Sequence, residues 1–127
     1  MKLTLFLILG LTLWPAAAPQ GAGRDCEQHA DRVYRTTEVD RKAKLTYRQE
    51  PSYPEKMRDS GRSGHTKLRM VLRPDGRVTD IEVLESSDPE FSEASIAAAK
   101  KLRFVPALKG GCPVAQSTII INHYTTF

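Results

Sequence analysis

An α+β fold is predicted by the sequence, with helices packed on a small antiparallel sheet. Two alternating polar and apolar runs flank a turn, the first ending at Leu72 and the second beginning at Val78. A helix-like stretch follows from Pro89, and an apolar strand comes last. Runs with a period of two, combined with separate helices, are typical of an antiparallel sheet covered on one face.

A short first helix is expected at residues 55–60. Pro51 and Pro54 hold the preceding chain extended, because proline fixes its own φ and restricts the residue before it. Pro54 also suits the first turn of a helix, where its missing N–H is not needed, and Gly61 is placed to end the helix.

The hairpin that follows is the clearest element of the sequence. Its first strand is apolar on one face, which consists of Thr66, Leu68, Met70 and Leu72. The turn at residues 73–77 contains a proline, which presets a negative φ, and a glycine, which supplies a positive φ. These two signals together predict a tight connection to a return strand.

The return strand has Val78, Ile81 and Val83 as its apolar positions. Because Val78 is out of phase with the other two, a β-bulge is expected near Thr79–Asp80. Gly64, just before the first strand, is expected to let the chain bend into it.

The second helix is expected to begin at the sequence Asp88-Pro89-Glu90. Aspartate can cap a helix, proline suits its first position, and glutamate favours its positive end. The face that packs on the sheet is expected to consist of Phe91, Ala94 or Ser95, Ala98 and Leu102.

The end of the chain is expected to be extended. Phe104 and Val105 precede a proline and are interpreted as an extended core anchor. Gly110–Gly111 predicts a turn, and residues 114–124 predict the last strand, with Ile119–Ile121 as its apolar positions.

Residues 24–50 are rich in charges and sparse in apolar positions, so we expect a charged N-terminal arm with little structure. Val33 and Tyr34 could share one helical turn, and Leu45 with Tyr47 alternates as a short strand would. The region from residue 51 to residue 127 is expected to form the folded domain.

The first 23 residues are interpreted as a secretory signal peptide. A lysine precedes an apolar run from Leu3 to Trp14, and small residues, prolines and glycines follow it. The run is shorter than the ~18–20 residues that a membrane-spanning helix needs. Export to the periplasm is therefore expected, with an uncleaved short anchor as the alternative.

Two cysteines, Cys26 and Cys112, lie in the part of the chain that follows the leader. In an oxidising compartment an isolated pair without close spacing most simply forms one disulfide. The alternative is a zinc site, in which His29 and His123 would complete four ligands with the two cysteines.

Composition and motifs argue against several function classes. The net charge of +4 is mild and no arginine stripe with interleaved aromatic residues is present, so nucleic-acid binding is not expected. The sequence has no nucleophile motif, phosphate-binding loop or dinucleotide fingerprint. We expect neither enzymatic activity nor a cofactor.

The order of landmarks in the second half resembles the C-terminal domain of TonB, the energy transducer that contacts outer-membrane receptors. In sequence order the landmarks are Tyr53-Pro54, Gly64, Asp75-Gly76, Ser86-Ser87, Arg103-Phe104-Val105-Pro106-Ala107 and Gly111-Cys112-Pro113-Val114. The resemblance implies a sheet of about three strands with two helices packed on it. It also implies a protein-binding role in the periplasm, in TonB-dependent transport.

The resemblance implies a binding site at the edge of the last strand, where an extended receptor peptide could add itself to the sheet. The expected edge consists of Gln116, Ser117, Thr118, Ile119, Ile120, Ile121, Asn122, His123 and Tyr124, with the side chains of Gln116, Asn122 and Tyr124 as candidate contacts. The same edge could pair with a second copy as a homodimer.

Two alternatives stay open at this stage. The arm could cover the edge and leave Ile119–Ile121 as core residues only. The chain could then be a disulfide-stapled secreted module, structural or binding a small ligand or zinc, with the same fold and no transport role. The sequence also has no proline-rich spacer, which the family uses to cross the periplasm, so force transmission is not expected of this domain alone.

Overall fold

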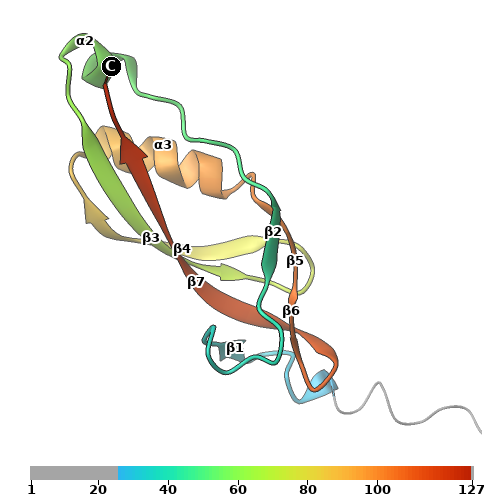
Figure 1. Cartoon of the computed structure of the whole chain (residues 1–127). Helices are drawn as coiled ribbons and strands as arrows, with labels where there is room; N and C mark the ends of the chain where they lie inside the picture. Colours follow the sequence, from blue (N-terminus) through green and yellow to red (C-terminus); the bar gives the residue numbers. More distant parts are fainter. Residues whose placement is uncertain (1–25, 127) are drawn as a thin grey trace, which may run out of the picture.

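Two sheets and two helices make up residues 26–126, which are the residues described by the computed structural model (Figure 1). The signal peptide expected at residues 1–23 lies outside them. The α+β class is confirmed. Among the described residues, no helix is long and apolar enough to cross a membrane.

The main sheet has five strands, more than the three that were expected. Its central path runs in the order β1-β7-β3-β4, and β6 also pairs with β7. The bounds of these strands are β1 Val33–Tyr34, β3 Gly64–Leu72, β4 Val78–Ser86, β6 Ala107–Lys109 and β7 Cys112–Tyr124. All pairs are antiparallel except that of β1 with β7, so the sheet is mixed.

Strands β3 and β7 pair without interruption from Gly64 opposite Tyr124 to Leu72 opposite Gln116. The predicted apolar face of β3 is fully buried, and Ile120 faces Leu68 across the pair. The second helix, α3 (Pro89–Ala99), covers this face (Figure 1).

The predicted bulge lies in β4. The register shifts between the pairs Arg69–Glu82 and Val71–Thr79, which leaves one extra residue on β4. Asp80 adopts a positive φ of 52° there, and its carboxylate accepts a hydrogen bond of 2.8 Å from the Arg73 guanidinium. The bulge increases the local twist of the hairpin, as bulges generally do.

Glycine is needed at position 64 because a side chain would have no room there, rather than because the chain must bend. A Cβ atom at this position would lie 2.6 Å from Cε2 of Phe91 and 2.9 Å from the Cβ of Ser87. Phe91 is buried in a cluster with Met57 and Tyr124, so the ring cannot move away without loss of packing. The first helix, α2 (Glu55–Asp59), supplies Met57 to the same cluster.

A second, two-stranded sheet consists of β2 (Lys44–Tyr47) and β5 (Arg103–Val105). It had been expected only in part, because the strand at Leu45 and Tyr47 was predicted but its partner was not. Phe104 packs against the main core, whereas Val105 is 41% exposed and is no core anchor. Side chains alternate along a strand, so the two neighbours face opposite ways.

The N-terminal arm is more ordered than expected. Val33 and Tyr34 form β1 rather than a helical turn, because Tyr34 pairs in parallel with Gln116 of β7. The Tyr34 side chain is buried in a cluster that contains Val114. A disulfide joins Cys26 to Cys112 at the start of β7, as predicted.

Candidate peptide-binding edge

Strand β7 is flanked by other strands along its whole length on one side only. On that side it pairs with β3 from Gln116 to Tyr124. Next to β3 on that side, β6 pairs with residues 112–114, whereas on the other side β1 pairs with Ala115 and Gln116. From Ser117 to Tyr124, no strand within residues 26–126 pairs with this second side.

Gln116 lies inside the sheet rather than at the expected edge. Tyr34 pairs with it on one flank and Leu72 on the other. Its side chain is 3% exposed, and its Oε1 accepts a hydrogen bond of 2.8 Å from the backbone N–H of Ala43. The open part of the edge therefore begins at Ser117.

Two hydrogen bonds identify the backbone groups that face the open side. The hydroxyl of Thr36 donates to the carbonyl of Ser117 at 3.3 Å, and the Arg48 guanidinium donates to the carbonyl of Ile121 at 3.2 Å. Backbone groups alternate in direction along a paired strand. The N–H and C=O of Ile119 and His123 therefore face the open side as well.

The side chains of β7 divide between the two faces of the sheet. Ile120, Asn122 and Tyr124 are buried on the face that α3 covers. Ile119 and Ile121 point to the other face and are 48% and 47% exposed, so they are not core residues. An added strand would place alternate side chains beside these two isoleucines.

The face with the exposed isoleucines has a charged neighbour strand whose charges are already paired. Lys67 lies opposite Ile121 and is 3.6 Å from Glu85, and Arg69 lies opposite Ile119 and is 3.3 Å from Glu82. Such exposed ion pairs contribute little to stability, but they leave little unbalanced charge beside the edge.

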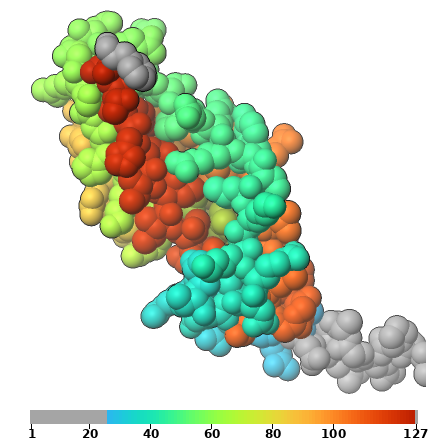
Figure 2. Space-filling view, viewed as in Figure 1, coloured from blue at the N-terminus to red at the C-terminus, as the bar shows by residue number. Residues whose placement is uncertain are grey.

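A groove runs along the far half of the open edge. One wall is Ile121–Thr125, and the other is formed by residues Arg48, Glu50, Pro51 and Tyr53 of the segment that connects β2 to α2. Its volume is about 670 Å³. Figure 2 shows the arm, in blue-green, beside β7, in red. We call residues 48–54 the connecting segment.

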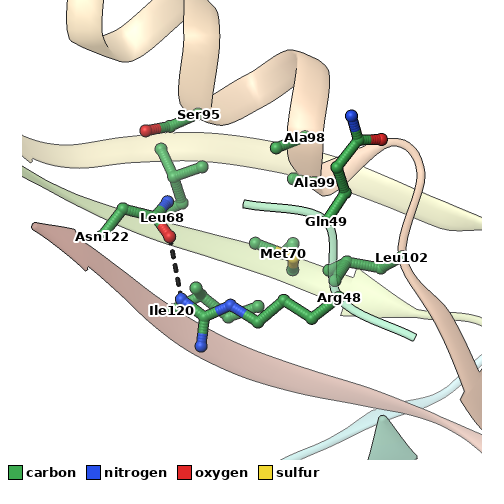
Figure 3. Close-up of a pocket in the computed structure, with 10 residues that line it drawn as sticks. All are labelled: Arg48, Gln49, Leu68, Met70, Ser95, Ala98, Ala99, Leu102, Ile120 and Asn122. Carbon is green, nitrogen blue, oxygen red and sulfur yellow. Dashed lines mark hydrogen bonds between the residues drawn. The ribbon is translucent and has the colours of Figure 1, made fainter. Parts of the chain in front are cut away.

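Arg48 bridges the two walls of this groove. Besides the Ile121 carbonyl, its Nη2 donates to Oδ1 of Asn122 at 2.8 Å (Figure 3). The space behind it, between Leu68, Met70 and α3, is only about 10 Å³ and holds at most one water. A small organic ligand therefore has no cavity at this point.

A buried hydroxyl network stands behind the end of the edge. The hydroxyl of Ser95 lies 2.6 Å from the Thr66 hydroxyl and 2.7 Å from the Tyr124 hydroxyl, which donates to the Phe91 carbonyl at 3.1 Å. Burial raises the pKa of the Tyr124 phenol above its ordinary value, and the hydrogen bond with Ser95 opposes part of this rise. The network keeps the end of β7 in place.

The zinc alternative is not supported by the geometry. Both sulfur atoms are joined in the Cys26–Cys112 disulfide, and a zinc ligand must be a thiolate. His29 is hydrogen-bonded to the Tyr34 hydroxyl, and His123 lies beside His65 on the far part of β7. Residues 26–126 contain no group of three or more side chains suited to a metal.

Sequence reasoning missed the residues that surround the edge, although it located the strand. The sequence places Arg48 in the arm, and Pro51 and Tyr53 in the extended stretch before the first helix. These residues lie beside β7 because of the path that the connecting segment takes in space. The local sequence pattern does not predict that path. The pairing of Tyr34 with β7 was missed for the same reason.

The chain is similar to known proteins along this region. A family model described as the Gram-negative bacterial TonB protein C-terminal matches residues 49–125, which is more than half of the chain. Protein TonB of Pseudomonas aeruginosa is 36% identical over 67 residues, 52% of this chain and 20% of that protein. This chain thus spans about a fifth of that relative.

A solved structure also matches. The solution NMR structure of the Pseudomonas aeruginosa TonB C-terminal domain has a TM-score of 0.58 to this chain at 31% identity. The match covers 67% of this chain and 87% of that structure.

Proposed function

The chain belongs to the family of Gram-negative bacterial TonB C-terminal domains, and we propose that it is a cell-envelope module that binds an extended peptide at its β7 edge. The peptide adds as a strand along Ser117–Tyr124. Main-chain hydrogen bonds supply the affinity, and alternate side chains supply the selectivity.

The single observation that carries this proposal is the open side of β7. Exposed strand edges are normally short, charged, bulged or covered, because free backbone groups invite pairing with another chain. Here the edge is long, carries Ile119 and Ile121 on its exposed face, and borders a groove of about 670 Å³. These features support a guest strand at this position.

The partner we propose is a protein of the outer membrane, with the N-terminal segment of a TonB-dependent receptor as the peptide. The site of action is then the periplasm, and the role is in TonB-dependent transport. Family membership supports this assignment, because the matched family is named for the TonB protein C-terminal region.

The test is a titration of the isotope-labelled domain with N-terminal receptor peptides, followed by the amide signals of residues 117–124. We expect shifts concentrated at Ile119, Ile121 and His123, whose backbone groups face the open side. Absence of any shift at millimolar peptide would contradict strand addition.

Peptides with single N-methyl groups provide the matched control. In an added strand, alternate backbone N–H groups point toward β7, so methylation at every second position should abolish binding, and methylation at the positions between should preserve it. Equal effects at all positions would indicate side-chain docking instead. A protein-concentration series without peptide tests whether the edge pairs with a second copy.

A further inference from the structure

Arg48 makes contact with the part of β7 that a guest strand needs. Its guanidinium donates to the carbonyl of Ile121, one of the four β7 residues whose backbone groups face the open side. It also donates to the side-chain oxygen of Asn122. The connecting segment thereby holds one backbone acceptor of the edge without forming a strand.

These partners of Arg48 are neutral. No carboxylate among residues 26–126 forms an ion pair with it, although Glu50 lies on the same wall of the groove. A hydrogen bond from an exposed guanidinium to a carbonyl is a modest interaction that water and other donors can replace. The contact can therefore hold the segment in place and still open.

The arm that carries Arg48 is fastened to β7 at four other places. The Cys26–Cys112 disulfide joins the arm to the start of β7, β1 pairs with Ala115 and Gln116, and the Thr36 hydroxyl donates to the Ser117 carbonyl. Gln116 also accepts the hydrogen bond from Ala43. Because these attachments hold the arm beside β7, Arg48 meets the edge at high effective concentration.

We propose that Arg48 is a latch with which the connecting segment competes against a guest strand for the edge of β7. The inference rests on the proposed function, since it concerns access to the same edge. A guest strand pairs through Ile121 only after its own N–H replaces the guanidinium. The free domain is then partly self-occupied, and its apparent affinity for peptide is reduced by the fraction of open molecules.

The experiment compares peptide binding by the wild-type protein, the Arg48→Ala variant and the Arg103→Ala variant, all with the disulfide intact. Arg103 is an exposed arginine on β5, so its loss removes the same charge from the neighbouring sheet without touching the edge. The probe is a fluorescein-labelled N-terminal receptor peptide from the titration series.

We expect Arg48→Ala to bind the peptide about three- to tenfold more tightly, as for the loss of one competing hydrogen bond. The gain should come from a faster association rate, because the peptide no longer waits for the latch to open. Arg103→Ala should bind as the wild type does. A merely structural role of Arg48 would lower stability without raising the association rate.

The outcomes separate this inference from the proposed function. Equal binding by the wild type and Arg48→Ala overturns the latch and leaves strand addition standing. Weaker binding by Arg48→Ala also overturns it and assigns Arg48 to the bound peptide instead. If no variant binds any peptide of the series, the proposed function fails and the latch fails with it.

Discussion

At the scale of single residues, the polar groups inside the core decide how firmly the end of β7 is held. Thr66 and Ser95 are almost fully buried, and Tyr124 is nearly so. Their hydroxyl groups satisfy one another, and among residues 26–126 no buried side-chain polar atom lacks a hydrogen-bond partner. Removing one member leaves another without a partner, which is costly in a core.

Tyr124 makes this network dependent on pH. Its pKa is raised in the folded protein by burial, so the unfolded chain releases the phenol proton first. The contribution of the Tyr124 phenol to the free energy of unfolding is therefore fully present below the unfolded pKa of about 10. It is lost as the pH rises through the folded pKa.

We expect the Tyr124→Phe variant to be less stable than the wild type by about 1–2 kcal/mol at pH 8, because two hydrogen bonds are lost. The difference between the two proteins should shrink between pH 10 and pH 11, as the unfolded tyrosine ionises. Urea unfolding at both pH values measures it. An unchanged difference across this range would show that the phenol does not resist ionisation.

At the scale of elements, the start of α3 depends on one side chain. Asp88 precedes the helix with an extended backbone, and its Oδ1 accepts a hydrogen bond of 3.0 Å from the N–H of Glu90. The same carboxylate lies 3.6 Å from the guanidinium of Arg62. Pro89 follows at the first helical position, so the start predicted for this helix is confirmed.

Asp88→Ala should lower the free energy of unfolding by about 0.5–2 kcal/mol, because the helix loses its cap. Asp88→Asn is the matched control, since asparagine can accept the same hydrogen bond but has no charge for Arg62. We expect the asparagine variant to lie within about 0.5 kcal/mol of the wild type, because the Arg62 guanidinium is largely exposed to solvent and such ion pairs contribute little. Thermal unfolding of the three proteins measures these differences in stability. An equal loss of stability in both variants would show that the charge of Asp88, and not its capping hydrogen bond, stabilises the helix.

Strand β7 shows how one element can serve two purposes. Its first part, from Cys112 to Gln116, is enclosed by β6, β1 and β3, whereas the part from Ser117 onward is paired on one side. The enclosed part holds the strand in register, and the open part carries the proposed binding site. A rigid anchor next to an open edge suits strand addition, because little order must be gained on binding.

At the scale of the whole molecule, the disulfide adds a covalent link between the arm and the domain to the pairing of β1 with β7. The two cysteines are 86 residues apart, and Cys112 is buried beside Tyr34 of the arm. Closing a loop of this length restricts the unfolded chain, which stabilises the fold by about 4–5 kcal/mol in the chain-entropy description.

Replacing both cysteines, as Cys26→Ala with Cys112→Ala, should lower the unfolding free energy by several kcal/mol, up to about 5. Amide hydrogen exchange should speed up first in the arm around β1. Without the covalent link, this part of the arm is held to β7 by a strand pairing of two residues. Reduction of the wild-type protein with a thiol is the control, since it opens the bridge without changing a side chain. A wild-type unfolding midpoint that does not respond to reduction would contradict this role.

The sequence by itself determined the elements whose signals are local. The hairpin turn needs only a proline and a glycine at fixed places, the bulge follows from the phase of Val78, and the start of α3 follows from Asp88 and Pro89. Alternation along β3 predicted its buried face correctly, because side-chain direction along a strand has a period of two.

Only the tertiary structure decided how the N-terminal arm meets β7. Pairing of Tyr34 with Gln116, exposure of Ile119 and Ile121, and the contact of Arg48 with Ile121 all join segments far apart in the sequence. An apolar residue in a strand does not indicate which face is covered, and a charged arm does not indicate where it lies. Both are settled by which neighbours fill the space, since burial depends on the packing of distant segments.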